Sequence, residues 1–290
     1  MRRFDALLRE ALGSVLGHNL EDSQWDQASL PVSMGGMGLR RAELHSPASY
    51  TSSIAHSHQL VSEILSPIIY TPFHINEAID LLNSAVVEPL SFLDLKSKPK
   101  KQITHAIDSK LQSSICASAL SANDRVRLSC VAKSRASGFL NVVPSPGLGL
   151  SMRPSEFRCA ALYRLGAPIF ERDAMCPACG RMSDKYGHHA IGCAVHGERI
   201  CRHNDLCNIL FRTAQKANLG PAREYRGLIP GSSARPADIF LKNWVRRRDA
   251  ALDVTVISPM QVAVVDQEAS NPGYALRLAW DRKMRTAFEA

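Results

Sequence analysis

Two kinds of segment are absent from this sequence of 290 residues. No stretch approaches the roughly 18 consecutive apolar residues that a membrane span requires, so we expect no transmembrane helix and no membrane partner. The N-terminal segment has an amphipathic pattern in place of the apolar run of a signal peptide, which predicts a nuclear or cytoplasmic protein that is not secreted. Hydrophobic residues still make up 45 % of the chain, so the sequence can bury a core.

The excess positive charge is concentrated in one part of the chain. The formal net charge is +8; residues 151–250 carry 17 basic and 9 acidic side chains, whereas the other 190 residues carry 18 of each. Such a bias is typical of a polyanion-binding region. We therefore expect a nucleic acid as partner, with a solvated basic surface that binds nothing specific as the alternative.

Most of the first 170 residues show apolar side chains at helical spacing. A stripe from Phe4 to Leu16 predicts a first helix, and the stripes within 75–86 and 103–115 predict two more, separated by a Lys-rich linker at 96–101. A further helix is expected over 154–165, closed by Gly166. The first 170 residues should therefore be mostly helical.

A glycine-rich segment from Leu30 to Arg41 interrupts this helical pattern. Glycines near arginines can hold a phosphate, but the spacing here matches neither a P-loop nor a GxGxxG motif. We therefore interpret the segment as a tight turn that leads into another helix.

After residue 197 the pattern changes to a mixture of helices and strands. Residues 198–218 and 274–288 predict helices, and Ala237–Leu241 and Ala250–Ile257 predict two strands joined by a basic loop, Lys242–Asp249. This order of elements indicates a small α+β or α/β unit.

The strongest local motif is a cysteine- and histidine-rich segment formed by Cys176, Cys179, His188, His189 and Cys193. The spacing is Cys-x2-Cys-x8-His-x4-Cys through His188, or x9 and x3 through His189, and both spacings suit a tetrahedral structural zinc site. Four protein ligands leave no open coordination position, so we expect this zinc to hold structure rather than to activate water. The alternative is three buried free thiols and two surface histidines.

Two acidic residues predict a second kind of site. Asp238 begins the first predicted strand and Asp253 lies within the second, so a hairpin would bring both carboxylates to one side of the sheet. A shared Mg²⁺ would lower their repulsion and activate water against a phosphodiester, with caps and turns as the alternative role for such aspartates. Thr255 occupies the position where many nucleases have a lysine, so we expect Lys283 on the last helix to replace it. Glu224 is a candidate for a further acid.

Several basic residues are candidates for nucleic-acid contacts. His203 either contacts a phosphate or caps a helix, while Cys201 and Cys207 on the same predicted helix are expected to do no chemistry. The nucleic-acid candidates are Arg202, His203, Arg235, Arg246, Arg247 and Arg248.

Three stretches together resemble the C-terminal region of non-LTR retrotransposon reverse transcriptase polyproteins that carry a restriction-like endonuclease. The glycine-rich segment resembles the thumb end, the Cys/His motif resembles the Cys-Cys-His-Cys knuckle, and Arg235-Pro236-Ala237-Asp238 with Asp253 resembles the R-P-D…D/E nuclease signature. In that signature the lysine is often displaced to a later helix. The family spacing favours His188 as the zinc ligand, but the Gly-x-His-Ala-x-x-Cys run favours His189, which we prefer.

The resemblance implies an enzyme that nicks one strand of target DNA, so that the exposed 3′ end primes reverse transcription. No Tyr/Phe-x-Asp-Asp pair is present in the sequence, so we expect no polymerase activity. Family members usually continue with a further strand and helix, which leaves both a complete and a truncated nuclease fold open.

The predicted fold class is a mostly α N-terminal part, a small zinc knuckle and a C-terminal α/β restriction-endonuclease-like unit. The expected domains are a thumb-like helical segment at 1–70, a helical connector at 71–170, the zinc knuckle at 171–197 and the endonuclease at 198–290. The predicted function is Mg-dependent nicking of DNA by a zinc-stabilised nucleic-acid-binding protein. The alternatives are a non-catalytic binding remnant, with RNA as another possible partner, and a structural helical protein.

Overall fold

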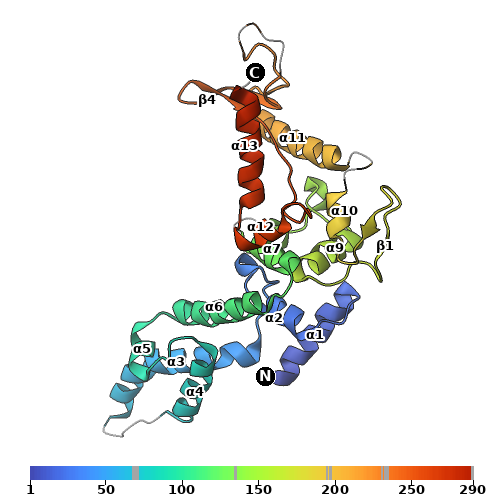
Figure 1. Ribbon diagram of the computed structural model, residues 1–290. Helices are drawn as coiled ribbons and strands as arrows, with labels where there is room; N and C mark the ends of the chain where they lie inside the picture. The colour runs from blue at the N-terminus through green and yellow to red at the C-terminus, as the bar shows by residue number, and fades with distance from the viewer. Residues whose placement is uncertain are drawn as a thin grey trace. The chain divides into compact units, whose positions relative to one another are not determined.

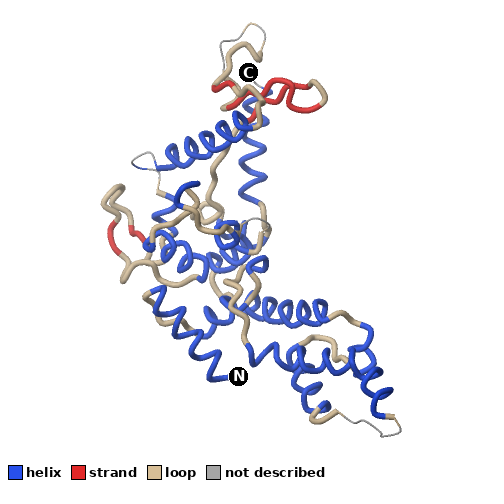
Figure 2. Tube along the Cα trace, turned by 180° about the vertical axis from the view of Figure 1, so that it is seen from behind, coloured by secondary structure: helices blue, strands red, loops and turns tan. Residues whose placement is uncertain are grey.

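The computed structural model of the chain describes residues 1–66, 72–133, 136–193, 195, 198–229, 231 and 235–288. The chain divides into two compact units, Met1–Ile169 and Phe170–Ala290, which are described separately. Over the described residues it is mostly helical, and two small antiparallel sheets lie in the second unit (Figures 1 and 2). No helix in the described ranges combines the length and the apolar character needed to cross a membrane.

The first unit is built from helices that enclose two main apolar clusters. One cluster, which includes Leu16 and Trp25, lies between the first, second and ninth helices. The other, which includes Leu82 and Ile107, lies among the third to sixth helices. The helices are α1 (Arg2–Leu16), α2 (Asp22–Ser29), α3 (Ala42–Leu65), α4 (Ile75–Ala85), α5 (Phe92–Ser97), α6 (Lys100–Ser118), α7 (Ala122–Val131), α8 (Gly138–Asn141) and α9 (Pro154–Leu165).

The periodic stripes correctly predict helices α1, α4 and α6, and the helix expected over 154–165 is α9, which Gly166 ends with φ 66°. The predicted linker at 96–101 is wrong, because α5 ends at Ser97 and α6 already begins at Lys100. Leu95 is fully buried and anchors α5 in the apolar cluster. Pro99 directly precedes α6. A residue at this position donates no intrahelical hydrogen bond, so the missing N–H group of proline costs the helix nothing.

The glycine-rich segment forms the predicted tight turn. The amide of Gly36 donates to the carbonyl of Pro31 at 3.1 Å, and the amide of Gly38 donates to the carbonyl of Leu30 at 2.9 Å. These amides are already paired with the backbone of the turn, so they do not form a phosphate cradle.

A buried polar network joins this turn to α2, α7 and α9. Gln27 donates to the carbonyls of Gly35 and Arg164, and it accepts a hydrogen bond from Arg127 at 2.8 Å. Arg164 in turn donates to the carbonyl of Gly36 at 3.0 Å. Burial lowers the pKa of both arginines. Because buried polar groups are costly when unpaired, this network holds the turn in one conformation.

The second unit combines short strands with helices. Its helix α11 packs against the three-stranded sheet, where Ala214 meets Ile239 and Leu241 in a small apolar cluster. The two-stranded sheet pairs β1 (Ala174–Met175) with β2 (Met182–Ser183), and the other sheet has the order β3 (Ala222–Arg223), β4 (Ile239–Val245), β5 (Arg248–Leu252). The helices are α10 (His188–Gly192), α11 (Glu198–Lys216), α12 (Val265–Ser270) and α13 (Tyr274–Phe288).

The β4–β5 hairpin is present as predicted, but its bounds differ from the prediction. The expected basic loop is only a two-residue turn, because Arg246 and Arg247 both adopt positive φ angles, 51° and 62°, as a type I′ turn requires. The second strand ends at Leu252 rather than at Ile257. The amide of Val254 donates to a side chain, that of Asp238, instead of continuing the backbone ladder.

Candidate functional site

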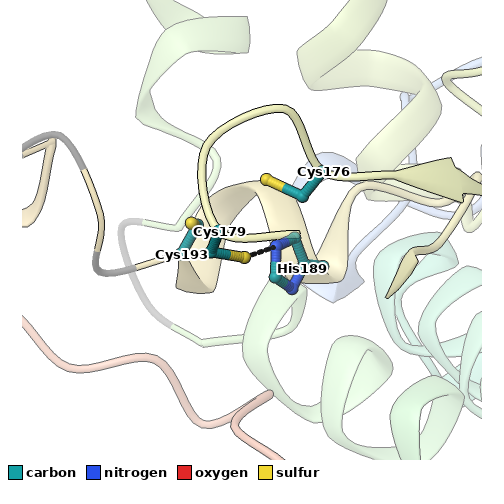
Figure 3. A group of neighbouring side chains, drawn as sticks. All are labelled: Cys176, Cys179, His189 and Cys193. Carbon is teal, nitrogen blue, oxygen red and sulfur yellow. Dashed lines mark hydrogen bonds between the residues drawn. The ribbon is translucent and has the colours of Figure 1, made fainter. Parts of the chain in front are cut away.

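Four side chains of the second unit converge on one point, as Figure 3 shows. Cys176, Cys179, His189 and Cys193, called the Cys/His cluster below, each offer one ligand atom, and these atoms all lie within 4.8 Å of one another. The Sγ atom of Cys179 is 3.3 Å from Nε2 of His189. Three thiols and one imidazole are a donor set that fits a structural zinc ion. The prediction that these cysteines gather with a histidine is confirmed.

The backbone around the cluster explains how residues distant in sequence meet. Cys176 directly follows β1, and Cys179 lies in the turn that leads to β2. The turn closes through a hydrogen bond of 2.9 Å from the amide of Gly180 to the carbonyl of Cys176, and Gly180 has φ 66°, which favours glycine. His189 lies on α10, and Cys193 directly follows that helix.

Asp184 orients the histidine of the cluster. Its carboxylate accepts hydrogen bonds from the amides of His188 at 3.1 Å and His189 at 2.7 Å, at the start of α10. Burial would raise the pKa of Asp184, but these amides outweigh it and hold the pKa below its usual value. The ring of His188 stacks with Tyr186, with the ring centroids 6.1 Å apart. Of the two candidate histidines, the structure therefore brings His189 into the cluster.

The thiols of the cluster differ in acidity. The amide of Cys179 and the side chain of His189 lower the pKa of Cys176 to about 6. The amide of Val195 acts in the same direction on Cys193, but burial and the neighbouring thiols raise the pKa of Cys193. Cys176 thus ionises more readily than Cys193, and a bound cation would favour the thiolate form of both.

The second group of candidates lies where the three-stranded sheet ends. The register pairs Ile239 with Leu252, so Asp238 and Asp253 are the residues directly beyond this pair, where the β4–β5 ladder stops. On the β3 side of β4, the amide of Glu224 donates to the carbonyl of Asp238 at 3.1 Å. Three acidic residues therefore share one row across the sheet, which we call the acidic row: Glu224, Asp238 and Asp253.

Each aspartate of the acidic row has its own partners. Asp253 forms an ion pair with Lys283 of α13, and both side chains are partly exposed. The Oδ2 atom of Asp238 accepts a hydrogen bond of 2.7 Å from the amide of Val254 and lies 3.2 Å from Nε2 of His203. Lys283 of the last helix therefore contacts one aspartate of the acidic row.

Two of the predicted nucleic-acid residues have partners within the protein. Arg235 forms an ion pair with Glu224. The half-buried Arg202 donates to the carbonyl of Ile191 at 2.6 Å and so connects α11 to α10. Both arginines thus have a partner inside the protein, and Glu224 is paired with a cation.

The other predicted arginines lie at the end of the hairpin, drawn as red strands in Figure 2. Arg246, Arg247 and Arg248 are all exposed, and no carboxylate of the described residues forms an ion pair with them. Trp244, on the same hairpin, is 49 % exposed. Three exposed arginines and an exposed aromatic ring on one hairpin are a combination that suits nucleic-acid backbones and bases.

One residue beside the acidic row was missed in the sequence analysis. Cys207, from which we expected no chemistry, is buried and has its Sγ atom 3.7 Å from Nε2 of His203. The available signal was the four-residue spacing of His203 and Cys207, which places both side chains on one face of α11.

Comparison with protein-family models, with curated proteins and with solved structures finds no match to this chain in any of the three. Its function must therefore be inferred from the geometry of these sites and from the chemistry of their side chains.

Proposed function

We propose that the protein binds nucleic acid and nicks DNA with the aid of a divalent cation, as expected for a retrotransposon-derived endonuclease. The observation that supports this most directly is the acidic row with its cation. Asp238 and Asp253 directly follow the last pair of the β4–β5 register, and Lys283 reaches Asp253 from a separate helix. Two carboxylates and a lysine on a sheet edge are the residue types that phosphodiester hydrolysis by this class of nuclease uses.

The two aspartates of the row are suited to share a cation. Carboxylate oxygens are ligands that Mg²⁺ accepts, and a bound Mg²⁺ would activate water and stabilise charge on the phosphate. Asp238 is held in one orientation by the amide of Val254. Lys283 places a positive charge beside the row, where it can stabilise the developing negative charge on the scissile phosphate.

The hairpin is the proposed contact surface for the polyanion. The guanidinium groups of Arg246, Arg247 and Arg248 can neutralise phosphates, and the exposed ring of Trp244 can stack on a base. This surface belongs to the same hairpin that carries the acidic row at its other end. Binding and cleavage residues are therefore connected by one short pair of strands.

The Cys/His cluster has a structural role in this proposal. Over the described part of the segment, Cys176 is the only buried hydrophobic residue between β1 and Cys193, so the segment has little core of its own. Zinc bound by three thiolates and His189 would supply the free energy that orders β1, β2 and α10. The half-buried Arg202 then joins this ordered segment to α11.

Nicking of supercoiled plasmid in the presence of Mg²⁺ or Mn²⁺ tests the proposed activity. We expect Asp238→Asn and Asp253→Asn to lose at least about 100-fold in rate, because each removes a charged ligand, and Lys283→Ala to lose activity without losing DNA binding. Asp249→Asn is the matched control, since it makes the same charge change on the same hairpin. Its side-chain oxygen can still accept the hydrogen bond from the amide of Asn243. Equal rates for Asp253→Asn and the wild type would refute the assignment.

A second candidate function, binding without cleavage, is favoured by the same contacts. Lys283 already neutralises Asp253, and Asp238 is engaged by Val254 and His203. This alternative predicts salt-dependent binding with no nicking by the wild type. Under either function, replacing Arg246, Arg247 and Arg248 by alanine should reduce the slope of log K against log salt for duplex DNA by up to about 3.

A further inference from the structure

We infer that the second unit holds a second transition-metal site, formed by His203, Cys207 and Asp238. Among the described residues these three side chains each offer one ligand atom, and the atoms lie within 4.8 Å of one another. The site is distinct from the Cys/His cluster, with which it shares no residue. The inference goes beyond the proposed function, because the site would bind its ion whether or not the protein cleaves DNA.

The local structure explains why these three residues meet. His203 and Cys207 are four positions apart on α11, so their side chains lie on one face of the helix. The same helix packs on β4 through the apolar cluster around Ile239. Asp238 directly precedes that buried isoleucine, so packing of α11 on the sheet brings the carboxylate to the histidine and the cysteine.

Two of the distances between the donor atoms are close to those around a tetrahedral ion. Zinc binds nitrogen and oxygen at about 2.0–2.2 Å and sulfur at about 2.3 Å, so neighbouring donors in a tetrahedron are about 3.3–3.8 Å apart. Here Sγ of Cys207 is 3.7 Å from Nε2 of His203, and Nε2 of His203 is 3.2 Å from Oδ2 of Asp238. An ion could thus enter between them with little movement of the side chains.

The surroundings of the donors also suit metal binding. Nδ1 of His203 lies 3.3 Å from Oδ1 of Asn204, which leaves Nε2 to the ion when Nδ1 carries the proton. Histidine ligands commonly donate their second ring nitrogen in this way. The amide of Val254 holds the carboxylate of Asp238. Cys207 is buried, so its sulfur is shielded from bulk solvent.

The donor set selects the kind of ion. An imidazole and a thiolate favour zinc or cobalt over Mg²⁺, which prefers oxygen ligands only. Three protein ligands leave one coordination position for water or a ligand, unlike the four-ligand Cys/His cluster. A surface pocket of about 360 Å³ beside the site provides access, and it is lined by Arg199, Ile200, His203, Val254, Thr255 and Val256.

Metal analysis of the purified full chain, after saturation with Zn²⁺ and removal of unbound ions, tests the inference. We expect two zinc ions per chain in the wild type and one in Cys207→Ser and in His203→Ala. Cys201→Ser is the matched control, because this exposed thiol lies on the same helix outside the site, and it should retain two ions. One ion in the wild type, or two in both Cys207→Ser and His203→Ala, would overturn the inference.

Cobalt substitution gives a second measurement that does not depend on zinc stoichiometry. Co²⁺ bound to a thiolate absorbs in the near ultraviolet, so the wild type should show a stronger charge-transfer band than Cys207→Ser, whereas Cys201→Ser should match the wild type. Equal bands in wild type and Cys207→Ser would contradict the inference. Failure of the nicking assay would leave both metal readouts unchanged, so the two proposals fail separately.

Discussion

The glycine-rich turn of the first unit offers the sharpest test of the fold, through the substitution Gly36→Ala. A Cβ atom added at Gly36 would lie 2.0 Å from the carbonyl oxygen of Leu30 and 2.6 Å from that of Gln27. Both atoms belong to the backbone, so neither can rotate away as the end of a flexible side chain would. The turn must therefore open, although the φ angle of Gly36 itself is one that alanine tolerates.

The cost of this substitution follows from two effects. Forcing an extra carbon into a packed site typically costs about 1–3 kcal/mol. Opening the turn also moves the carbonyl of Gly36 away from the buried guanidinium of Arg164, and an unpaired buried donor costs about 1–3 kcal/mol more. We expect the free energy of unfolding of the first unit to fall by roughly 2–6 kcal/mol.

Urea unfolding followed by tryptophan fluorescence measures this loss. Trp25 is buried in the first unit, whereas Trp244 and Trp280 are exposed, so the change in emission reports mainly on Trp25. A loss of about 3 kcal/mol should lower the urea midpoint by at least about 1 M. Gly147→Ala is the control, because a Cβ atom there meets nothing within 4 Å. Equal midpoints for Gly36→Ala and Gly147→Ala would refute the close approach in the turn.

Three further predictions concern the metal, the pH dependence and the last helix. Cys179→Ser should remove one zinc ion per chain and raise hydrogen exchange in β1, β2 and α10, because the ion replaces a core there. Burial lowers the pKa of His45, so the unfolded chain takes up a proton at a higher pH than the folded chain. The melting temperature should therefore decrease when the pH is lowered below about 6.5, and it should decrease less in His45→Gln. The buried carboxylate of Glu268 accepts hydrogen bonds from the amides of Gly273 and Ala275 at the start of α13, so Glu268→Ala should cost about 1–2 kcal/mol and speed exchange of these helix amides by about 5- to 30-fold.

Each of these predictions has a control and an outcome that contradicts it. Cys116→Ser replaces an exposed thiol in the first unit and should leave the zinc content unchanged, so an equal loss in both variants would argue against the cluster. An unaltered pH profile in His45→Gln would show that another group controls acid stability. Glu268→Gln keeps the acceptor oxygen and should be milder than Glu268→Ala; identical exchange in Glu268→Ala and the wild type would exclude the cap.

The helices with an apolar stripe could be predicted from the sequence, but α2 could not. This helix, Asp22–Ser29, buries Gln24, Gln27 and Ser29 as well as Trp25, so it has no apolar period. Its stability depends on the polar network that joins Gln27 to Arg127 and Arg164, which lie 100 and 137 residues later in the sequence. Hydrophobic periodicity detects only the burial of apolar side chains, so it does not detect a helix that buries glutamine side chains.

The hairpin shows a different limit of the sequence signal. Its turn consists of Arg246 and Arg247 at positive φ, where Asn and Gly are the usual residues, so no turn signal marks the position. Lys242 to Val245 and Arg248 therefore resemble a basic loop, although they belong to strands. Pairing of β4 with β5 overrides this local composition.

The two metal-ligand groups differ in how far they could be predicted. The Cys/His cluster could be predicted from the spacing of its residues between Cys176 and Cys193. Only the choice of histidine required the structure, in which Asp184 caps the start of α10. The group around Cys207 combines a helix with a residue 31 positions later, so it exists only after α11 has packed on β4. The spacing of His203 and Cys207 on α11 indicates only two of the three donors, and the third is supplied by the packing.

Asp238 belongs both to the acidic row and to the proposed transition-metal site. Its carboxylate can therefore serve either a Mg²⁺-dependent carboxylate pair or a site with His203 and Cys207, and the variant Cys207→Ser distinguishes the two. A carboxylate pair that works with Mg²⁺ needs Asp238 and Asp253 but gains nothing from a thiol, since Mg²⁺ favours oxygen ligands. If Cys207→Ser keeps the nicking rate in Mg²⁺, the acidic row acts without the softer donors. If the rate falls together with the zinc content, the ion held by His203 and Cys207 is the one that supports cleavage. Asp238→Asn should impair both readouts in either case, because no other carboxylate of the described residues contacts His203.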